Sequence, residues 1–393
     1  MRWLIAAFAI LFVQTSAFAD AKFIAYLNGP VKKIALAQGL SPAQFAQAIE
    51  GIQAPDALVL KLASNQPEFT STTGAYLAKA VTAQRIENGK AKRKSEANLL
   101  AAIEARYGVR REILLAIWGM ESNFGGNIGD MKVIRSLATL AYSGKRVDFA
   151  RQQLAAAFRI LKSKVIAPSR FVGSWAGAMG HTQFIPTSYL ASAVDWDGDG
   201  KRDIWGNYAD ALASSANYLK KAGWQTGIPW GVEIILPKGF DMSLVGRQNW
   251  KPFSAWQKLG LKAALGGELG PGDAKAFVMM PQGPDGPAFL ATANFMAIMA
   301  YNQSHSYSIA VGHMADRIAG QGPLQGAFHE PNIDLSFAER VELQKRLTRA
   351  GFNTGGSDGR FGARTYEAIL AFQKKRGLAL DAKPTKALLK ALR

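Results

Sequence analysis

The chain contains no cysteine, and this absence limits how a protein of 393 residues can be stabilised. It can form neither disulfide bonds nor a zinc site with thiolate ligands. Its four histidines also lack the pairwise spacing of metal ligands, which argues against catalytic zinc. Hydrophobic cores must therefore hold the fold together, and a chain of this length can form two or three domains.

The first nineteen residues have the pattern of a secretory signal peptide. Arg2 supplies a positive charge, an apolar run follows over residues 3–13, and Ala17 and Ala19 place small side chains where signal peptidase reads. The run is too short to span a bilayer, and no later segment approaches about 18 consecutive apolar residues. We therefore expect residues 1–19 to be cleaved on export. We expect no transmembrane anchor and, without cysteine, no lipid anchor at the mature N-terminus.

The formal net charge of +18 indicates that the chain binds negatively charged partners. In a cytosolic protein such a balance would suggest nucleic acid. An exported protein meets the acidic polymers of the cell envelope instead, so we expect no nucleic-acid binding. The basic residues are spread along the chain, and the densest cluster, residues 90–94, is predicted to be a solvated loop or helix end.

Hydrophobic periodicity predicts a mainly α-helical fold. Residues 20–110 have helical spacing, with Ser41 as a helix cap before Pro42, and further helices are expected up to residue 225. From about 226 to 288, glycine and proline become frequent and Val232–Leu236 has the composition of a strand. This stretch is predicted to be a small inserted excursion that contains β-structure.

Helix is predicted to resume over residues 288–300 and again near 309–318. Residues 321–333 lack periodicity and are predicted to be a linker. The remaining residues, 334–393, are predicted to form a small helical module. Its helices are expected near 336–350, near 363–376 and after Pro384.

One predicted helix carries an acidic residue in its last turn. In the helix predicted over residues 111–121, Ile117 and Trp118 lie on one apolar face. Glu121 lies on the same face, because it follows Ile117 by four positions and Trp118 by three. Apolar surroundings and the negative end of the helix dipole would both raise the pKa of this carboxyl. A carboxyl that keeps its proton near neutral pH can serve as the general acid of glycoside cleavage. The alternative is a surface glutamate at a frayed helix end.

Three segments, in this order, resemble the motifs of the membrane-bound lytic transglycosylase B family. They are WGMESNFG at 118–125, GAMGHTQFIPTSY at 177–189, and residues 293–307, which begin ANF and end in AYNQSHSY. The resemblance covers roughly residues 22–320, and the order and spacing of the motifs make it specific. It implies a lysozyme-like, mainly α-helical catalytic domain over residues 20–320, with the β-containing excursion inserted in it.

The resemblance also implies a reaction. The enzyme would cleave the β-1,4 bond between N-acetylmuramic acid and N-acetylglucosamine in peptidoglycan without consuming water. Glu121 would protonate the leaving oxygen and then act as base while the C6 hydroxyl closes a 1,6-anhydro ring. Other glycosidases need a second carboxylate across the scissile bond, and the three motifs contain none, although a distant one could fold into place. A hydrolytic muramidase and a non-catalytic peptidoglycan-binding scaffold stay open as alternatives.

The family's cleft positions map onto a set of polar and aromatic residues in this chain. They are Ser174, Gln183, Tyr218, Tyr301, Asn302 and Tyr307. Serine and glutamine can form hydrogen bonds with acetamido and hydroxyl groups, and tyrosine can pack on a sugar face. The alternative for each tyrosine is core packing with a satisfied hydroxyl. His181, within the second motif, is expected to have a structural or neutral role; the alternative is a contact at the rim of the cleft.

Residues 195–201, DWDGDGK, resemble the start of an EF-hand calcium loop, with acids at positions 1, 3 and 5 and glycine at 6. Position 12 departs from that pattern because Gly206 replaces the bidentate glutamate. The family resemblance supplies an aspartate further on. The predicted ligands are Asp195, Asp197, Asp199, the backbone carbonyl of Lys201, and Asp210. We expect a weak structural Ca²⁺ site and no cofactor for the chemistry; the alternative is an Asp/Gly turn that binds nothing.

The last part of the chain resembles the peptidoglycan-binding domain type 1. The likeness lies in residues 341–347, 358–365 and 371–373, and it departs from the family pattern at Asp381–Pro384. It implies a three-helix bundle that holds the enzyme on glycan strands of peptidoglycan. With the signal peptide, it implies a periplasmic protein.

Overall fold

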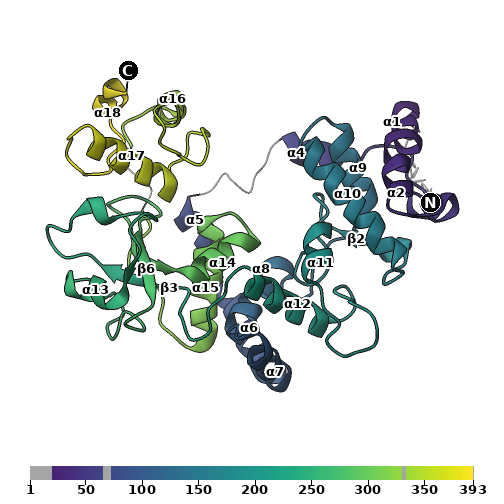
Figure 1. Cartoon of the computed structure of the whole chain (residues 1–393), viewed down its shortest axis with the longest axis horizontal. Coiled ribbons are helices and arrows are strands. Elements are labelled where there is room, and N and C mark those ends of the chain that lie inside the picture. The colour runs from purple at the N-terminus through teal and green to yellow at the C-terminus, as the bar shows by residue number, and fades with distance from the viewer. Residues whose placement is uncertain (1–19, 65–71, 330–332, 393) are drawn as a thin grey trace, which may run out of the picture. The chain divides into compact units, whose positions relative to one another are not determined.

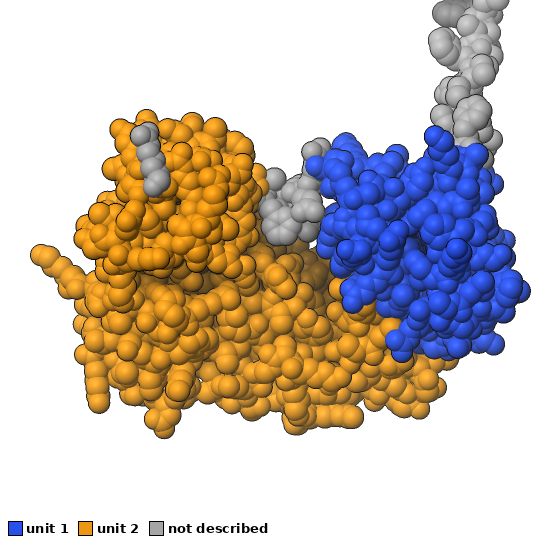
Figure 2. Space-filling model, turned by 45° about the horizontal axis from the view of Figure 1, so that its top comes forward, with its two compact units in different colours: residues 1–65, 130–178 blue, residues 66–129, 179–393 orange. Residues whose placement is uncertain are grey.

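The computed structural model describes residues 20–64, 72–329 and 333–392 (Figure 1). The expected signal peptide, residues 1–19, lies outside the described residues. Contacts divide the chain into a smaller unit, residues 1–65 with 130–178, and a larger unit, residues 66–129 with 179–393 (Figure 2). The boundaries at 20–320 and 334–393, drawn from composition and motifs, stay predictions. Within the described residues, no helix has both the length and the apolarity needed to cross a membrane.

The smaller unit is built from short helices. Its elements are α1 (Ala21–Tyr26), a π-helical segment (Leu27–Val31), α2 (Lys32–Ala37), α3 (Pro42–Ala48), α4 (Ala57–Ser64), β1 (Met131–Lys132), α9 (Val133–Tyr142), α10 (Val147–Lys162), a 3-10 turn (Pro168–Arg170) and β2 (Val172–Gly173). Ser41 caps α3 as predicted: its Oγ accepts from the Gln44 N–H, and the Gln44 side chain accepts from the Ser41 N–H.

The larger unit surrounds one fully packed helix. Its helices before the sheet are α5 (Thr73–Ala80), α6 (Ala83–Ser95), α7 (Ala97–Tyr107), α8 (Arg111–Ser122), α11 (Pro186–Ser192) and α12 (Tyr208–Lys221). After the sheet come α14 (Ala293–Tyr301) and α15 (His305–Ala319). Every residue of α8 from Glu112 to Gly119 is buried, and α15 packs along it (Figure 1). A Cβ on Gly119 would lie 2.6 Å from the Met314 side chain, so glycine permits this close approach.

The predicted excursion is a five-stranded antiparallel sheet. Its strands are β3 (Gly231–Ile235), β4 (Lys251–Pro252), β5 (Lys262–Ala263), β6 (Lys275–Met279) and β7 (Ala288–Thr292), in the order β4-β6-β7-β3-β5, with a 3-10 turn (Met242–Leu244) and α13 (Phe253–Lys258) between strands. Side chains alternate between two cores: Phe277 and Met279 face the helices, whereas Ala276 and Val278 face the second core with α13.

The predicted helix over residues 288–300 is wrong at its start. Residues Ala288–Thr292 form β7, and α14 begins only at Ala293. Every residue of β7 is buried, because both faces of the strand are covered. A strand buried on both faces is a continuous apolar run, which periodicity cannot distinguish from a buried helix. Pairing with β3 and β6 decides the conformation.

The C-terminal module is a helical bundle with its own core. Its helices are α16 (Phe337–Arg349), α17 (Ala363–Lys375) and α18 (Lys386–Ala391), close to the predicted positions. Leu343, Leu347 and Ile369 are fully buried among them. Tyr366 and Leu370 of α17 instead join the second core of the sheet, so the module is docked on the excursion (Figure 1).

A buried acid lies where α17 meets the rest of the larger unit. Burial raises the pKa of Glu367 from 4.5 to about 7, although the positive charges of Arg247 and Arg364 partly oppose this rise. The folded chain therefore keeps a proton that the unfolded chain releases between these two values. Stability falls as pH rises through that window.

We expect Glu367→Gln to remove this pH dependence. Between pH 5 and 8 the wild type should lose up to about 3 kcal/mol of unfolding free energy that the variant keeps. Urea denaturation at several pH values measures the difference. Glu342→Gln is the matched control, because Glu342 lies on α16 with a pKa lowered by its bond to Arg346. An equal slope in wild type and Glu367→Gln would contradict the prediction.

Candidate active site

Glu121 lies in the last turn of α8, half-buried, at a strained end of the helix. The three residues that follow α8, Asn123, Phe124 and Gly125, have φ of 50°, 58° and 87°. Left-handed backbone is easy for glycine and tolerated by asparagine, but a bulky side chain such as that of Phe124 rarely adopts it. Strain of this kind persists only where surrounding contacts hold it, and it is frequent at functional sites.

Ser122 and His181 hold this turn. The buried Ser122 hydroxyl donates to the His181 carbonyl (2.6 Å) and accepts from the Gly125 N–H (2.9 Å). The Trp118 indole donates to Nδ1 of His181 (3.2 Å), and burial lowers the pKa of this imidazole so that it stays a neutral acceptor. The first two motifs are therefore joined through His181, which has the structural role expected for it.

Tyr307 donates a hydrogen bond to Oε1 of Glu121 over 2.5 Å. Tyr307 is buried in the first turn of α15, where Ser304 caps the helix by accepting from the Tyr307 N–H. Burial, followed by the charge of Glu121, raises the pKa of the Tyr307 hydroxyl well above its ordinary value. The phenol thus keeps its proton and donates it in the hydrogen bond to Oε1 of Glu121.

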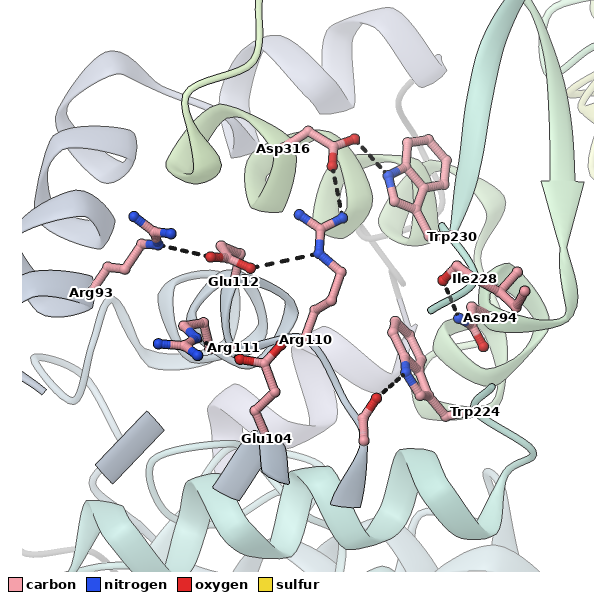
Figure 3. A network of polar contacts seen from close by, with 11 residues as sticks. Arg93, Glu104, Arg110, Arg111, Glu112, Trp224, Ile228, Trp230, Asn294 and Asp316 are labelled. Carbon is pink, nitrogen blue, oxygen red and sulfur yellow. Dashed lines mark hydrogen bonds and ion pairs between the residues drawn. The ribbon is translucent and has the colours of Figure 1, made fainter. Parts of the chain in front are cut away.

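The opposite ends of α8 and α15 are joined by charged side chains, of which Glu112 is buried and the others are partly exposed (Figure 3). Arg110 lies 3.6 Å from Glu112 and 3.3 Å from Asp316, and the Trp230 indole donates to Asp316 over 2.7 Å. Arg93 closes the group by binding Glu112 at 2.7 Å. Two antiparallel helices linked at both ends cannot slide past one another. This network fixes the register that brings Tyr307 to Glu121.

Tyr301 and Tyr218 form an aromatic cluster with Phe184. Their ring centroids are 5.1 to 5.8 Å apart. The Tyr301 hydroxyl donates to the Thr182 carbonyl (2.6 Å), and that of Tyr218 donates to the Ala300 carbonyl (2.6 Å). Burial and the nearby charge of Glu121 raise the pKa of Tyr301. Both hydroxyls are bound by main chain, so a substrate would meet mainly the rings.

The other predicted cleft residues have different surroundings. Gln183, with a left-handed φ of 51°, donates both amide hydrogens to main-chain carbonyls, of Ile128 (3.0 Å) and Gly180 (2.9 Å). Its carbonyl oxygen is the atom that can accept from a sugar. Asn302 is exposed at the C-terminal end of α14. Ser174 belongs to the smaller unit, where its hydroxyl accepts from the Ala178 N–H (3.0 Å) and supports a tight turn.

Sequence reasoning missed Tyr76, a residue of α5 whose hydroxyl contributes to the raised pKa of Tyr307. No motif surrounds Tyr76, and only the packing of α5 on α15 brings it near the site. The signal that could have indicated it is a half-buried tyrosine on the apolar side of a short helix, which is too common to be specific.

Asp195, Asp197 and Asp210 form a carboxylate cluster. One oxygen from each lies within 4.8 Å of the others. Asp210 is buried at the start of α12, where its two oxygens accept from the Trp196 and Asp203 N–H groups, both at 2.8 Å. Burial nevertheless raises the pKa of Asp210 to about 6. The oxygen-only donor set suits a hard cation such as Ca²⁺.

Asp199 lies outside that group of three. Its Oδ1 accepts from the Lys201 N–H (2.8 Å). Other backbone N–H groups of the loop likewise donate to carboxylates of the same loop. Asp195 accepts from the Gly198 and Gly200 N–H groups, each over 2.8 Å. The loop is thus ordered around the acids predicted as ligands.

Comparison with known proteins identifies the family. The model of the transglycosylase SLT domain matches residues 23–316, and that of a putative peptidoglycan binding domain matches residues 338–392. The chain belongs to the transglycosylase SLT domain family. The resemblance found in the motifs is thereby confirmed.

Solved structures of relatives cover most of the chain. SltB3 from Pseudomonas aeruginosa, in complex with NAG-anhNAM-pentapeptide, is 46% identical over 94% of this chain and 99% of that chain, with a TM-score of 0.83. Slt35 from Escherichia coli, in complex with calcium, is 26% identical over 75% and 92%, with a TM-score of 0.62. Membrane-bound lytic murein transglycosylase B of E. coli (strain K12) is 29% identical over 66% of this chain and 74% of its own. The predicted fold class, a mainly α-helical lysozyme-like domain with a helical C-terminal module, is confirmed.

Proposed function

We propose that Glu121 is both the acid and the base in cleavage of peptidoglycan glycan strands by this protein. The activity itself follows from the family: the protein is a lytic transglycosylase that acts on peptidoglycan. The observation that supports the role of Glu121 is its hydrogen bond from Tyr307, formed where two motifs of the family meet. This bond from a buried donor fixes the orientation of the carboxyl that we propose as the acid.

The proposed reaction has two proton transfers at the same carboxyl. Glu121 first gives its proton to the glycosidic oxygen as the bond between that oxygen and C1 of the muramoyl sugar breaks. The carboxylate then takes the proton of the C6 hydroxyl while O6 bonds to C1, closing the 1,6-anhydro ring. The nucleophile is intramolecular, so no second carboxylate is needed, in contrast to other glycosidases. The ring faces of Tyr301 and Tyr218, with Gln183, would support the sugars.

Glu121→Gln should lower the rate of cleavage of purified sacculi by about 10²–10⁴-fold, because the amide cannot transfer the proton. Mass analysis of the released muropeptides measures both rate and product. Anhydro ends from the wild type alone support the proposal. Reducing ends would favour a muramidase, and equal behaviour of both proteins would favour a binding scaffold. Glu87→Gln, an exposed site on α6, is the matched control and should cleave as wild type.

Tyr307→Phe tests the positioning role of the phenol. Loss of its hydrogen bond removes a donor that favours the charged carboxyl, so the Glu121 limb of the pH–rate profile should move to higher pH. The kcat should fall about tenfold or more, with little change in KM. Tyr301→Phe, which removes a hydroxyl bound to a main-chain carbonyl, should leave the limb in place. A purely structural role for Tyr307 would leave the pH limb unmoved in both variants.

We also propose that the cluster of Asp195, Asp197 and Asp210 holds a structural Ca²⁺, which would neutralise crowded carboxylates and stiffen the loop before α12. Adding CaCl₂ to about 1 mM should raise the melting temperature of the wild type. Asp197→Asn should abolish the rise, whereas the exposed control Asp273→Asn should keep it. If calcium does not change the melting temperature of the wild type, the proposed calcium site is wrong.

The location we propose is the periplasm. The N-terminal pattern of Arg2, an apolar run and Ala17 and Ala19 supports export, and peptidoglycan is the substrate of the family.

A further inference from the structure

A cavity of about 490 Å³ lies within the larger unit, and neither Glu121 nor Tyr307 is among the residues that line it. One side is formed by α16 and the loop that leads into α17. The other side is formed by Thr72 and Thr73 at the start of α5 and by residues 303–306, the segment that leads into α15. This volume falls in the range of sites that hold small ligands.

The charges around the cavity do not balance. Arg340, Arg360 and Arg364 line it, against one acid, Asp358. The Asp358 carboxylate already accepts from the Arg360 N–H (3.0 Å) and from the Gln344 amide (3.3 Å). Arg340 and Arg364 have no carboxylate within 4.0 Å in the part of the chain that the structure describes, and Nε of Arg340 is buried without a partner there. An anion would complete the site.

The groups behind the cavity do not supply that anion. Nε2 of His305, a lining residue, accepts from Arg247 over 3.1 Å, and burial with two nearby arginines lowers the pKa of this imidazole to about 3. His305 is therefore neutral at physiological pH. Glu367, which interacts with the charges of Arg247 and Arg364, keeps much of its proton up to its pKa of about 7. The local field stays positive.

We propose that this cavity binds a carboxylate of the peptide that branches from the glycan substrate. An arginine guanidinium pairs with a carboxylate through two parallel hydrogen bonds, which suits the end of a peptide better than a neutral sugar. The relative SltB3 was solved with a ligand that joins both sugars to a pentapeptide. This inference rests on the proposed function, since it is that substrate which carries the peptide.

The cavity also adjoins the catalytic machinery. Ser304 lines it, and the same serine caps α15 by accepting from the Tyr307 N–H. Ser306 lines it as well and shares a hydrogen bond with Thr73 of α5 (3.0 Å). A peptide held by the module would therefore rest on the segment that positions Tyr307. Peptide recognition and orientation of Glu121 would use one short piece of chain.

The test is calorimetric titration of the full-length protein with the free pentapeptide, the peptide-free disaccharide NAG-anhNAM, and inorganic phosphate. We expect the pentapeptide to bind, and Arg340→Gln/Arg364→Gln to weaken it by at least tenfold. Arg349→Gln removes the same charge from an exposed position of α16 outside the cavity and should bind as wild type. Arg340→Gln alone, on the outer helix, should weaken binding about threefold or more, which keeps the test valid if the double variant unfolds.

Equal pentapeptide affinity in wild type and both arginine variants would overturn the proposal. Phosphate that binds as tightly as the pentapeptide and competes with it would overturn it too, because the cavity would then be a general anion site. These titrations require no turnover. If the wild type binds the pentapeptide but does not cleave peptidoglycan, the result contradicts the proposed function and leaves this inference standing. If the wild type cleaves peptidoglycan but does not bind the pentapeptide, the result contradicts this inference alone.

Discussion

The antiparallel pair of α8 and α15 is the constraint on which the candidate site depends. At one end the pair is joined by the ion pairs of Arg110 with Glu112 and Asp316 (Figure 3), and at the other by the bond from Tyr307 to Glu121. Sliding of the two helices would separate these ion pairs and leave the buried Glu112 without a partner, so the arrangement resists it. Small residues such as Gly119 let the helices approach closely enough for both ends to meet.

Around this pair, the motifs have mainly a positioning function. Ser122 and His181 hold the left-handed turn that follows Glu121, and the second motif contributes the His181 ring against Trp118. A short stretch of sequence thus has to satisfy several buried hydrogen bonds at once. This explains physically why residue types that carry no chemistry, such as serine and glycine, occur so close to the acid.

Much of the fold could be predicted from sequence, because helical periodicity and helix caps act over a few residues. The helix cap at Ser41, the helix that ends after Glu121 and the helices of the C-terminal module were all expected at nearly their observed positions. Strand β7 could not be predicted, because its conformation depends on partners far along the chain. The same holds for Tyr76, which only the packing of α5 brings to the site.

Sequence alone determined the family, and it indicated Glu121 as the proposed acid and a cluster of aspartates as the proposed calcium site, since each depends on residue types at short and ordered spacing. Tertiary structure alone brought the Tyr307 hydroxyl to Oε1 of Glu121, since Tyr307 lies on another helix. It also decided that the C-terminal module docks on the sheet through Tyr366 and leaves a cavity rich in arginine. Contacts between distant segments follow from the packing of whole elements, and no local pattern records them.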